Sequence, residues 1–373
     1  MSRTPPPFRA DQVGSLVRPP ELIAARERFG KGEASLEELE RIQHAAIREV
    51  VARQEEIGLQ AVTDGEFNRA SWQTDFLLKF ANVQPAESRF SMRFHSEKGE
   101  TEGRPHTVRV VGKLARPRPL FVEDFKFLKS VAHAMPKITV PSPSVVHFRG
   151  GRAGIDAEAY PDLAEFYRDL ARVYREEIAD LAAAGCRYLQ LDEVNLAYLC
   201  DPELREDVRH NIGENPDVLP RTYAALINDA VAGRPTDMTV CLHLCRGNFA
   251  GNWMASGGYE PVAEVLFNEV GVDGYFLEYD TARAGGFEPL RLVPKGKRVV
   301  LGLVTTKRGQ IERTEDIVRR IDEASRFLPL EQLGLSPQCG FASGIAGATM
   351  STAEQFAKLK LIVEVAREVW GEQ

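Results

Sequence analysis

Short apolar segments alternate regularly with longer segments of helical periodicity, and this alternation restricts the fold more than any other feature of the chain. The strand candidates are residues 11–15, 59–63, 138–140, 187–191, 238–242, 274–277, 298–304 and 333–335. Helical periodicity fills residues 35–58, 160–184, 220–232, 259–268, 314–327 and 351–370. Strands that alternate with helices form parallel sheets, so we expect an α/β protein. Eight such strands within 373 residues predict a (β/α)8 TIM barrel.

A doubly wound open sheet is the alternative arrangement of the same elements. Its nucleotide-binding form is disfavoured, because no G-x-G-x-x-G motif follows the first strand candidate and no P-loop motif occurs. Residues 85–135 interrupt the alternation with short β-like stretches and a segment rich in proline and arginine. They are too few to bury a core of their own. We therefore expect a single domain over residues 1–373, with a β-rich insertion at about 85–135 between the second and third strands.

Local signals mark where several helices begin and end. Ser35 with Glu38, and Ser351 with Glu354, have the spacing of a capping box, in which two side chains satisfy N–H groups of the first turn. Gly185 follows a long helical pattern and is a natural C-terminal cap, because glycine adopts the left-handed conformation without strain. These signals predict helices that begin next to Ser35 and Ser351, and one that ends before Gly185.

The charge balance and the cysteine content restrict the partners and the compartment. A net charge of -7 gives no support for nucleic acid or an anionic membrane as the main partner. The five cysteines are odd in number and have no framework spacing, which argues for a reducing compartment. The first residues lack the apolar core of a signal peptide, and no run approaches the roughly 18 apolar residues of a membrane span. The cytoplasm is therefore the expected location.

Residues 241–248, with the sequence CLHLCRGN, are predicted to form a strand that runs into a glycine-containing turn. Side chains alternate along a strand, so His243 and Cys245 project from the same face. Imidazole nitrogen and thiolate sulfur are both good ligands of Zn²⁺. Glu278 and Cys339 also lie at ends of predicted strands and complete a candidate zinc site with His243 and Cys245. The alternative is that Cys245 packs as a small buried hydrophobic residue, as free cysteine usually does.

Other polar residues near strand ends have two interpretations each. Glu66 and Asp192 either face a binding site or cap the following helices, where carboxylates interact favourably with the helix dipole. Gly14 and Ser15 form either a tight turn or a backbone nest that binds an anion. His147 is expected to satisfy a local hydrogen bond, with a position in the site as the alternative. The residues alone leave these alternatives open.

Together these residues resemble those of the catalytic half of cobalamin-independent methionine synthase and, more closely, of its short single-domain relatives. The resemblance spans nearly the whole chain and implies the (β/α)8 barrel. It implies that a zinc ion is held by His243, Cys245, Glu278 and Cys339, the last of which lies in a Pro-x-Cys-Gly context. Zinc is therefore the expected cofactor.

The same resemblance assigns the residues that bind the amino acid substrate. It implies that Gly14 and Ser15 help to hold this substrate. Glu66, within Gly-Glu-Phe, and Asp192, within Asp-Glu, are implied to bind the ammonium group of homocysteine. Asp192 is thus expected to act in substrate binding and in catalysis.

Three parts of the family pattern differ in this chain. The family's catalytic histidine, in the loop after the seventh strand, aligns with Lys307, which makes Lys307 the expected catalytic acid. A tryptophan that stacks on the folate ring is replaced around residues 146–148. The duplicated N-terminal barrel of the full-length synthase, which helps to bind polyglutamylated folate, is not expected here. The thiol-activating half of the site is therefore expected to be intact.

These features predict a zinc-dependent methyltransferase that moves a methyl group to a thiolate, with homocysteine as the acceptor and methionine as the product. The methyl donor stays open between a folate, a methylated corrinoid carrier and another small methyl compound. One alternative is an alkyltransferase for another small thiol, which would not need Glu66 or Asp192 to bind an ammonium group. The other is a zinc-binding relative that has lost turnover. Whether the chain forms a homo-oligomer also stays open.

Overall fold

The computed structural model describes residues 5–371 apart from 89–91, 97–98, 104–105 and 346–347, so parts of the expected insertion lie outside the described residues. The strands are β1 (Ala61–Val62), β2 (Ala81–Glu87), β3 (Met92–Ser96), β4 (Gly99–Gly103), β5 (His106–Ala115), β6 (Met135–Pro136), β7 (Ile138–Pro141), β8 (Tyr188–Asp192), β9 (Thr239–Leu244), β10 (Gly274–Glu278), β11 (Arg298–Val304) and β12 (Leu333–Pro337).

The α-helices are α1 (Pro20–Gly30), α2 (Leu36–Glu56), α3 (Thr74–Leu77), α4 (Val122–Val131), α5 (Ser144–Phe148), α6 (Leu163–Ala183), α7 (Asn195–Tyr198), α8 (Pro202–Asp207), α9 (Leu219–Val231), α10 (Glu260–Glu264), α11 (Thr314–Ser325) and α12 (Thr352–Trp370). Short 3-10 helices are η1 (Gly151–Gly154), η4 (Ala282–Ala284), η5 (Glu288–Leu292) and η6 (Leu330–Gln332). The π-helical turns are η2 (Val208–Ile212) and η3 (Val265–Glu269).

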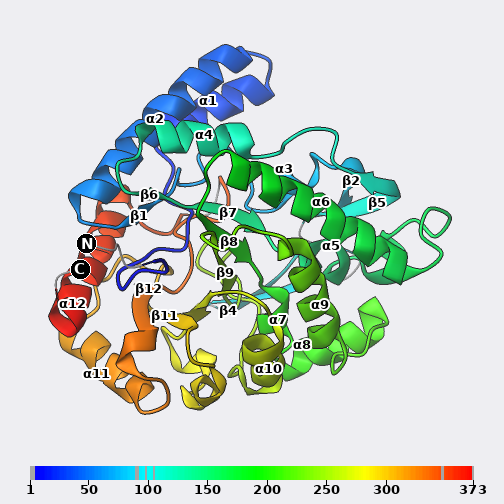
Figure 1. Cartoon of the computed structure of the whole chain (residues 1–373). Coiled ribbons are helices and arrows are strands. Elements are labelled where there is room, and N and C mark those ends of the chain that lie inside the picture. Colours follow the sequence, from blue (N-terminus) through cyan, green and yellow to red (C-terminus); the bar gives the residue numbers. More distant parts are fainter. Residues whose placement is uncertain (1–4, 89–91, 97–98, 104–105, 346–347, 372–373) are drawn as a thin grey trace.

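The main sheet consists of six parallel strands in the order β12-β11-β10-β9-β8-β7. This order follows the chain without a reversal, whereas a doubly wound sheet requires one. Strands β7, β8, β10 and β12 are buried along their whole length, as expected for a parallel sheet that helices cover. Helices such as α2, α6, α9, α11 and α12 are arranged around these strands in Figure 1. The α/β class predicted from the alternation is confirmed.

The prediction of a strand at residues 11–15 is wrong. The N-terminal segment joins the sheet through a single bridge between Ala10 and Leu335. The carboxylate of Asp11 accepts the backbone N–H groups of Phe8 and Gln12, and such local side-chain hydrogen bonds compete with a ladder. The backbone then turns at residue 14, a glycine whose φ of 147° favours that residue type.

The second predicted strand, residues 59–63, is reduced to β1, which pairs in parallel with β6. Thr63 Oγ1 donates to Gly14 O at 2.7 Å, so the N-terminal segment contacts the end of β1 as well as β12. The continuous ladder of the described residues nevertheless includes only the six strands of the main sheet. The closed eight-stranded barrel therefore stays a prediction.

The helices begin and end where the predicted caps lie. Ser35 caps α2, and Ser351 forms a complete capping box with Glu354 at the start of α12. Helix α6 begins later than expected because Asp162 caps it, and it ends before Gly185, whose φ is 97°. The expected helix at 259–268 is divided into α10 and η3. No helix in the described part of the chain combines the length and apolar character that a membrane span requires.

Strands β2 to β5 and helix α4 occupy most of the segment between α3 and β6. β2 pairs with β5 and β3 with β4, in both cases antiparallel. The β-rich part begins at Ala81, before the predicted start near residue 85, and residues 122–131 are helical. Val108, Val110 and Leu114 of β5 belong to the main hydrophobic core, so this segment packs against the rest of the chain.

A buried ion pair connects the N-terminal segment to β7 and β8. Lys137 Nζ lies 3.3 Å from Asp11 Oδ1, and both side chains are fully buried. Tyr188 Oη donates to the other oxygen of Asp11 at 2.7 Å, and Lys137 also donates to Gln12 O at 2.6 Å. Burial lowers the pKa of Lys137, while Asp11 raises it again. Asp11 thus compensates the charge of this lysine.

We expect Asp11→Ala to lower the free energy of unfolding by about 3–5 kcal/mol, because it leaves the Lys137 ammonium buried without its counter-charge. Urea denaturation measures this loss. The double variant Asp11→Ala/Lys137→Met removes both charges and should recover most of the stability. Equal stability of the single and double variants would contradict this role of the ion pair.

Candidate active site

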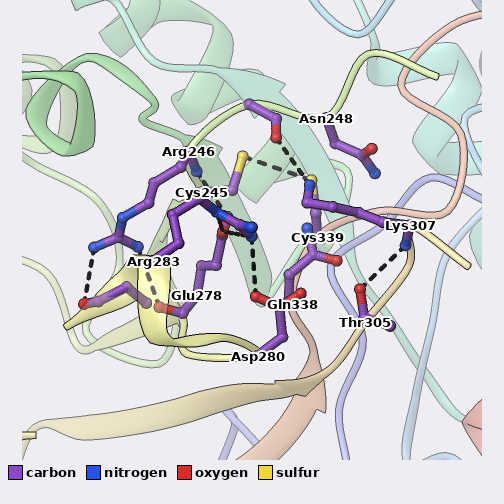
Figure 2. Close-up of polar contacts among 12 residues, drawn as sticks. Cys245, Arg246, Asn248, Glu278, Asp280, Arg283, Thr305, Lys307, Gln338 and Cys339 are labelled. Atoms are coloured by element: carbon purple, nitrogen blue, oxygen red, sulfur yellow. Dashed lines mark hydrogen bonds and ion pairs between the residues drawn. The ribbon is translucent and has the colours of Figure 1, made fainter. Parts of the chain in front are cut away.

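Strands β9 and β12 place three metal-ligating side chains at one point. His243 lies in β9, Cys245 directly follows β9, and Cys339 follows β12. The ligand atoms of these residues all lie within 4.8 Å of one another, and all three residues are buried. The Cys339 thiol lies 3.5 Å from the Cys245 sulfur (Figure 2). The structure therefore brings together three of the four predicted zinc ligands, which we call the His-Cys-Cys cluster.

The surroundings of His243 fit a metal ligand. Its side chain is 3% exposed, and neither ring nitrogen has a hydrogen-bond partner in the described part of the chain. Buried polar atoms without partners are unfavourable and usually have a function. Two sulfur atoms and an imidazole at this spacing are a donor set that suits Zn²⁺. The residues present therefore fit the metal that the sequence predicts.

The two thiols of the cluster have opposite pKa shifts. The pKa of Cys245 is held well below its ordinary value by the hydrogen bond from Cys339 and by His243, although burial opposes this. The pKa of Cys339 is raised well above its ordinary value by the same hydrogen bond and by burial. Burial lowers the pKa of His243, but the neighbouring Cys245, Asp192 and Glu278 raise it beyond the ordinary value. The cluster thus favours a thiolate at Cys245.

Glu278, the fourth predicted ligand, ends β10 and is fully buried, but it is not part of the His-Cys-Cys cluster. Its Oε1 accepts a hydrogen bond from Arg283 Nη2 at 2.6 Å, and its Oε2 accepts the Arg246 N–H at 2.8 Å. Burial raises the pKa of Glu278, but Lys307, Arg246 and Arg283 lower it overall. Glu278 is therefore a carboxylate held beside the cluster by cations (Figure 2).

The loop after β9 is fixed by residues to which the sequence pattern assigns no role. The buried Arg246 guanidinium donates to Gly257 O, Glu278 O and Ala284 O, and so joins the loop to the β10 end. Asn248 Nδ2 donates to Gly340 O at 3.0 Å, which connects the Cys245 and Cys339 loops. In the sequence, the position of Arg246 directly after Cys245 is the only sign that this arginine fixes the loop.

Lys307, the predicted catalytic acid, lies next to the cluster in Figure 2. Its Nζ donates to Gly247 O at 3.1 Å. Its charge lowers the pKa of both Glu278 and Cys339. Lys307 is not among the residues that line the cavity described next.

The His-Cys-Cys cluster opens into a cavity of about 660 Å³. Its wall includes the predicted substrate-binding residues Ser15, Glu66 and Asp192. A second part of the wall is apolar and contains Trp72, Leu78, Phe94, Phe249 and Met254. Phe94 belongs to β3, so the β-rich segment contributes to this wall. The cavity therefore joins a candidate metal site, a carboxylate pair and an apolar surface.

Glu66 and Asp192 face this cavity rather than serving only as helix caps. Glu66 has a φ of 61°, unusual for a residue other than glycine. Its Oε1 accepts the Thr139 hydroxyl at 2.9 Å, whereas its buried Oε2 has no partner among the described residues. Asp192 is the β-sheet neighbour of His243, and burial raises its pKa to about 7. Glu66 Oε1 also pairs with Arg69 at 3.8 Å, and Asp192 Oδ1 accepts from Gln190 at 2.7 Å, so Glu66 Oε2 is the buried carboxylate oxygen without a partner among the described residues.

Gly14 lies next to Thr139 and Glu66, and Ser15 lies next to Gly340 in the Cys339 loop. A Cβ atom at Gly14 would lie 2.6 Å from Thr139 Cγ2, so no other residue fits there without a shift. A Cβ atom at Gly340 would lie 1.9 Å from Ser15 Oγ, which shows how closely Ser15 approaches the Cys339 loop. Ser15 lines the cavity, whereas Gly14 is not among the lining residues; that the two hold the substrate stays a prediction.

His147, Cys186 and Cys200 have structural roles. His147 Nδ1 lies 2.9 Å from Tyr223 Oη, and the residue is fully buried away from the cavity lining. Cys186 donates to Tyr188 O and Cys200 to Leu196 O, each at 3.5 Å. All five cysteines are free. The local hydrogen bond expected for His147 agrees with this geometry.

Comparison with known sequences shows which proteins this chain is similar to. Residues 8–368 match the family "Cobalamin-independent synthase, Catalytic domain". The chain is 44% identical to the uncharacterized protein YxjH of Bacillus subtilis over 98% of this chain and 95% of that protein. It is 24% identical to the 5-methyltetrahydropteroyltriglutamate–homocysteine methyltransferase of a Synechococcus strain, over 99% of this chain but 44% of that protein.

Solved structures agree with this match. A Listeria monocytogenes protein assigned as a vitamin-B12-independent methionine synthase superimposes with a TM-score of 0.77 and 36% identity, covering 99% of this chain and 100% of that chain. A B12-independent methionine synthase from Shewanella sp. W3-18-1, solved with selenomethionine, has the same fold with a TM-score of 0.74 and 22% identity, covering 97% of each chain. The chain therefore belongs to the family of the catalytic domain of cobalamin-independent methionine synthase.

Proposed function

We propose that this protein is a zinc-dependent methyltransferase that converts the thiol of homocysteine into the methyl thioether of methionine. The observation that carries the proposal is the position of the His-Cys-Cys cluster in the same cavity as Glu66 and Asp192. A metal site beside a carboxylate pair suits a substrate that has both a thiol and an ammonium group. The family match is in accord with this chemistry.

We assign His243, Cys245 and Cys339 as the zinc ligands, with Glu278 as the fourth. When bound, Zn²⁺ would lower the pKa of the substrate thiol, which is ordinarily about 8.5, and so favour its thiolate. Glu278 can act as the fourth zinc ligand only if its carboxylate gives up the hydrogen bond from Arg283. The protein residues thus supply an electron-rich site, because two thiolates and a carboxylate are anionic.

The remaining polar residues of the cavity would hold the amino acid part of the substrate. The unpaired Glu66 Oε2 is a free acceptor for an ammonium group, and Asp192 is a second acceptor on the same wall. We assign Ser15, which lines the cavity, as a donor to the substrate carboxylate. The complex of the Shewanella relative with selenomethionine, an analogue of the expected product, supports an amino acid site in this fold.

In the proposed reaction, the substrate sulfur forms a bond to the methyl carbon while the bond from that carbon to the donor breaks. The bonding electrons leave with the donor, so a nitrogen leaving group must gain a proton. We assign Lys307 as the donor of this proton. This role requires its Nζ to exchange Gly247 O for the leaving group.

If Lys307 is the acid, Lys307→Met should lower kcat by about 100-fold with a nitrogen donor, because general acid catalysis contributes about that much. Lys307→His should keep most of the activity, since imidazole can supply the same proton. Steady-state kinetics at several pH values, with zinc content measured in parallel, test this. Wild-type turnover by zinc-loaded Lys307→Met would contradict the assignment.

We further propose that the strands form the closed (β/α)8 barrel of a single catalytic domain over residues 1–373. The contacts of residues 10–14 with both β12 and β1 support closure. Free cysteines throughout are in keeping with a reducing, cytoplasmic setting.

The direct test is transfer of a ¹³C-labelled methyl group to homocysteine by zinc-loaded protein, with methionine measured by mass spectrometry. Methyltetrahydrofolate and methylcobalamin represent two of the donor classes. Labelled methionine with either donor, and none with metal-free protein, would support the proposal. Tight zinc binding without transfer from any donor would favour a relative that has lost turnover.

A further inference from the structure

Arg149 is a buried cation without a protein partner. It directly follows α5, lines the cavity and is only 5% exposed. No described residue forms a hydrogen bond or an ion pair with its side chain, and its Nε is both buried and unpaired. Other buried arginines differ, since Arg18 donates to four carbonyl oxygens and Arg246 to three.

An unpaired guanidinium in this environment does not stabilise the fold. Burial lowers the pKa of Arg149, and Tyr198 is the only neighbour that raises it. Replacing such a charge by an apolar residue is often neutral or stabilising. Buried charged side chains normally have a partner in the protein, and those that lack one are commonly found at functional sites. The position of Arg149 on a cavity wall therefore indicates a ligand that brings the missing negative charge.

The cavity wall contains Arg149 together with the carboxylates Glu66 and Asp192. No hydrogen bond or ion pair joins the Arg149 side chain to either carboxylate among the described residues, and Glu66 pairs with Arg69 instead, at 3.8 Å. Tyr198 and Met254 lie on the same wall and are joined by a contact of 3.4 Å between Oη and Sδ. The proposed function assigns Ser15, Glu66 and Asp192 to the thiol substrate, which leaves Arg149 to the second substrate.

We infer that Arg149 recognises an oxyanion, a carboxylate or a phosphate, on the methyl donor, whose apolar part packs against the Trp72, Phe249 and Met254 wall. This inference rests on the proposed function, since it identifies the ligand as the donor of that reaction. A planar guanidinium suits such groups because it offers paired N–H donors in a fixed geometry. The donor class is therefore an anionic molecule with an apolar body.

The test measures the binding of three small probes to zinc-loaded protein by calorimetry: benzoate, phenyl phosphate and benzamide. Wild-type protein should bind at least one of the anions ten-fold or more tightly than neutral benzamide, and the tighter anion identifies the oxyanion. Arg149→Gln should abolish this preference. Arg168→Gln, which removes the same charge from an exposed position of α6, should keep it.

Thermal unfolding separates recognition from structural support. Arg149→Gln and Arg149→Leu should melt at or above the temperature of the wild type, because they remove an uncompensated buried charge. A clear fall in melting temperature for both variants would show that Arg149 supports the fold and would overturn the inference. So would an anion preference that persists in Arg149→Gln, or none in the wild type.

Two further results decide which substrate the anion belongs to. Homocysteine and 3-mercaptopropylamine, which lacks the carboxylate, should bind Arg149→Gln as they bind the wild type. A ten-fold loss for homocysteine alone would assign Arg149 to the thiol substrate and overturn the donor assignment. The proposed function can fail independently of the anion site. If the protein binds zinc but transfers no methyl group, the proposed function is refuted. If Arg149→Gln still loses the preference for anionic probes in that case, the anion site itself is supported.

Discussion

Cys339→Ser is expected to lose bound zinc and methyl transfer together. The Cys339 sulfur lies 3.5 Å from that of Cys245, and serine oxygen is a poor replacement for thiolate as a zinc ligand. We expect zinc, measured by mass spectrometry of the metal, to fall from about one to less than about 0.1 per chain, and activity to fall at least about 1000-fold.

The matched control is Cys186→Ser. Cys186 is also buried and free, but it precedes β8, at the end of the strand opposite to Asp192, and donates only to a backbone carbonyl. This variant should bind zinc and turn over as the wild type does. Full turnover by metal-free Cys339→Ser protein would refute the zinc mechanism, whereas equal loss in both variants would indicate misfolding.

Glu66→Gln is expected to raise KM for homocysteine by about 30- to 100-fold, because it removes a buried carboxylate that would otherwise pair with the substrate ammonium. The unpaired Oε2 and the cavity position of Glu66 are the basis for this expectation. Steady-state kinetics with homocysteine and with 4-mercaptobutyrate, which lacks the amino group, give the comparison.

The kinetics with 4-mercaptobutyrate should be nearly the same for wild type and Glu66→Gln, because this thiol has no ammonium group to lose a partner. Glu158→Gln, at an exposed position, is the control and should leave both thiols unaffected. Equal effects of Glu66→Gln on the two thiols would exclude an ammonium site. The alternative of an alkyltransferase for another small thiol would then be favoured.

Much of the site could be predicted because parallel strands bring their carboxyl ends to one edge. Side-chain alternation predicted that His243 of β9 and Cys245, which directly follows β9, lie together, and the predicted strand at 333–335 placed Cys339 nearby. The alternation of segments also predicted the α/β class and the five longest α-helices, α2, α6, α9, α11 and α12, because each of these helices has a clear apolar periodicity. Helix α1 and the short helices α3, α4, α5, α7 and α8 were not predicted.

Features that depend on distant partners could not be predicted in this way. Glu278 was placed correctly at the end of β10, but its hydrogen bond with Arg283 depends on the fold of the following loop. Residues 11–15 have a strand-like composition, yet Asp11 bonds to nearby N–H groups and to Tyr188 instead. The isolation of Arg149 is a property of its surroundings, which no local pattern of the sequence describes.

We propose that the His-Cys-Cys cluster holds zinc that activates the thiol of homocysteine. Zinc-edge X-ray absorption of the purified protein, with and without homocysteine, tests it most directly. We expect two sulfur neighbours of zinc at about 2.3 Å in the free protein and a third when homocysteine is added. An unchanged shell would contradict homocysteine as the substrate, and the absence of zinc would contradict the metal site itself.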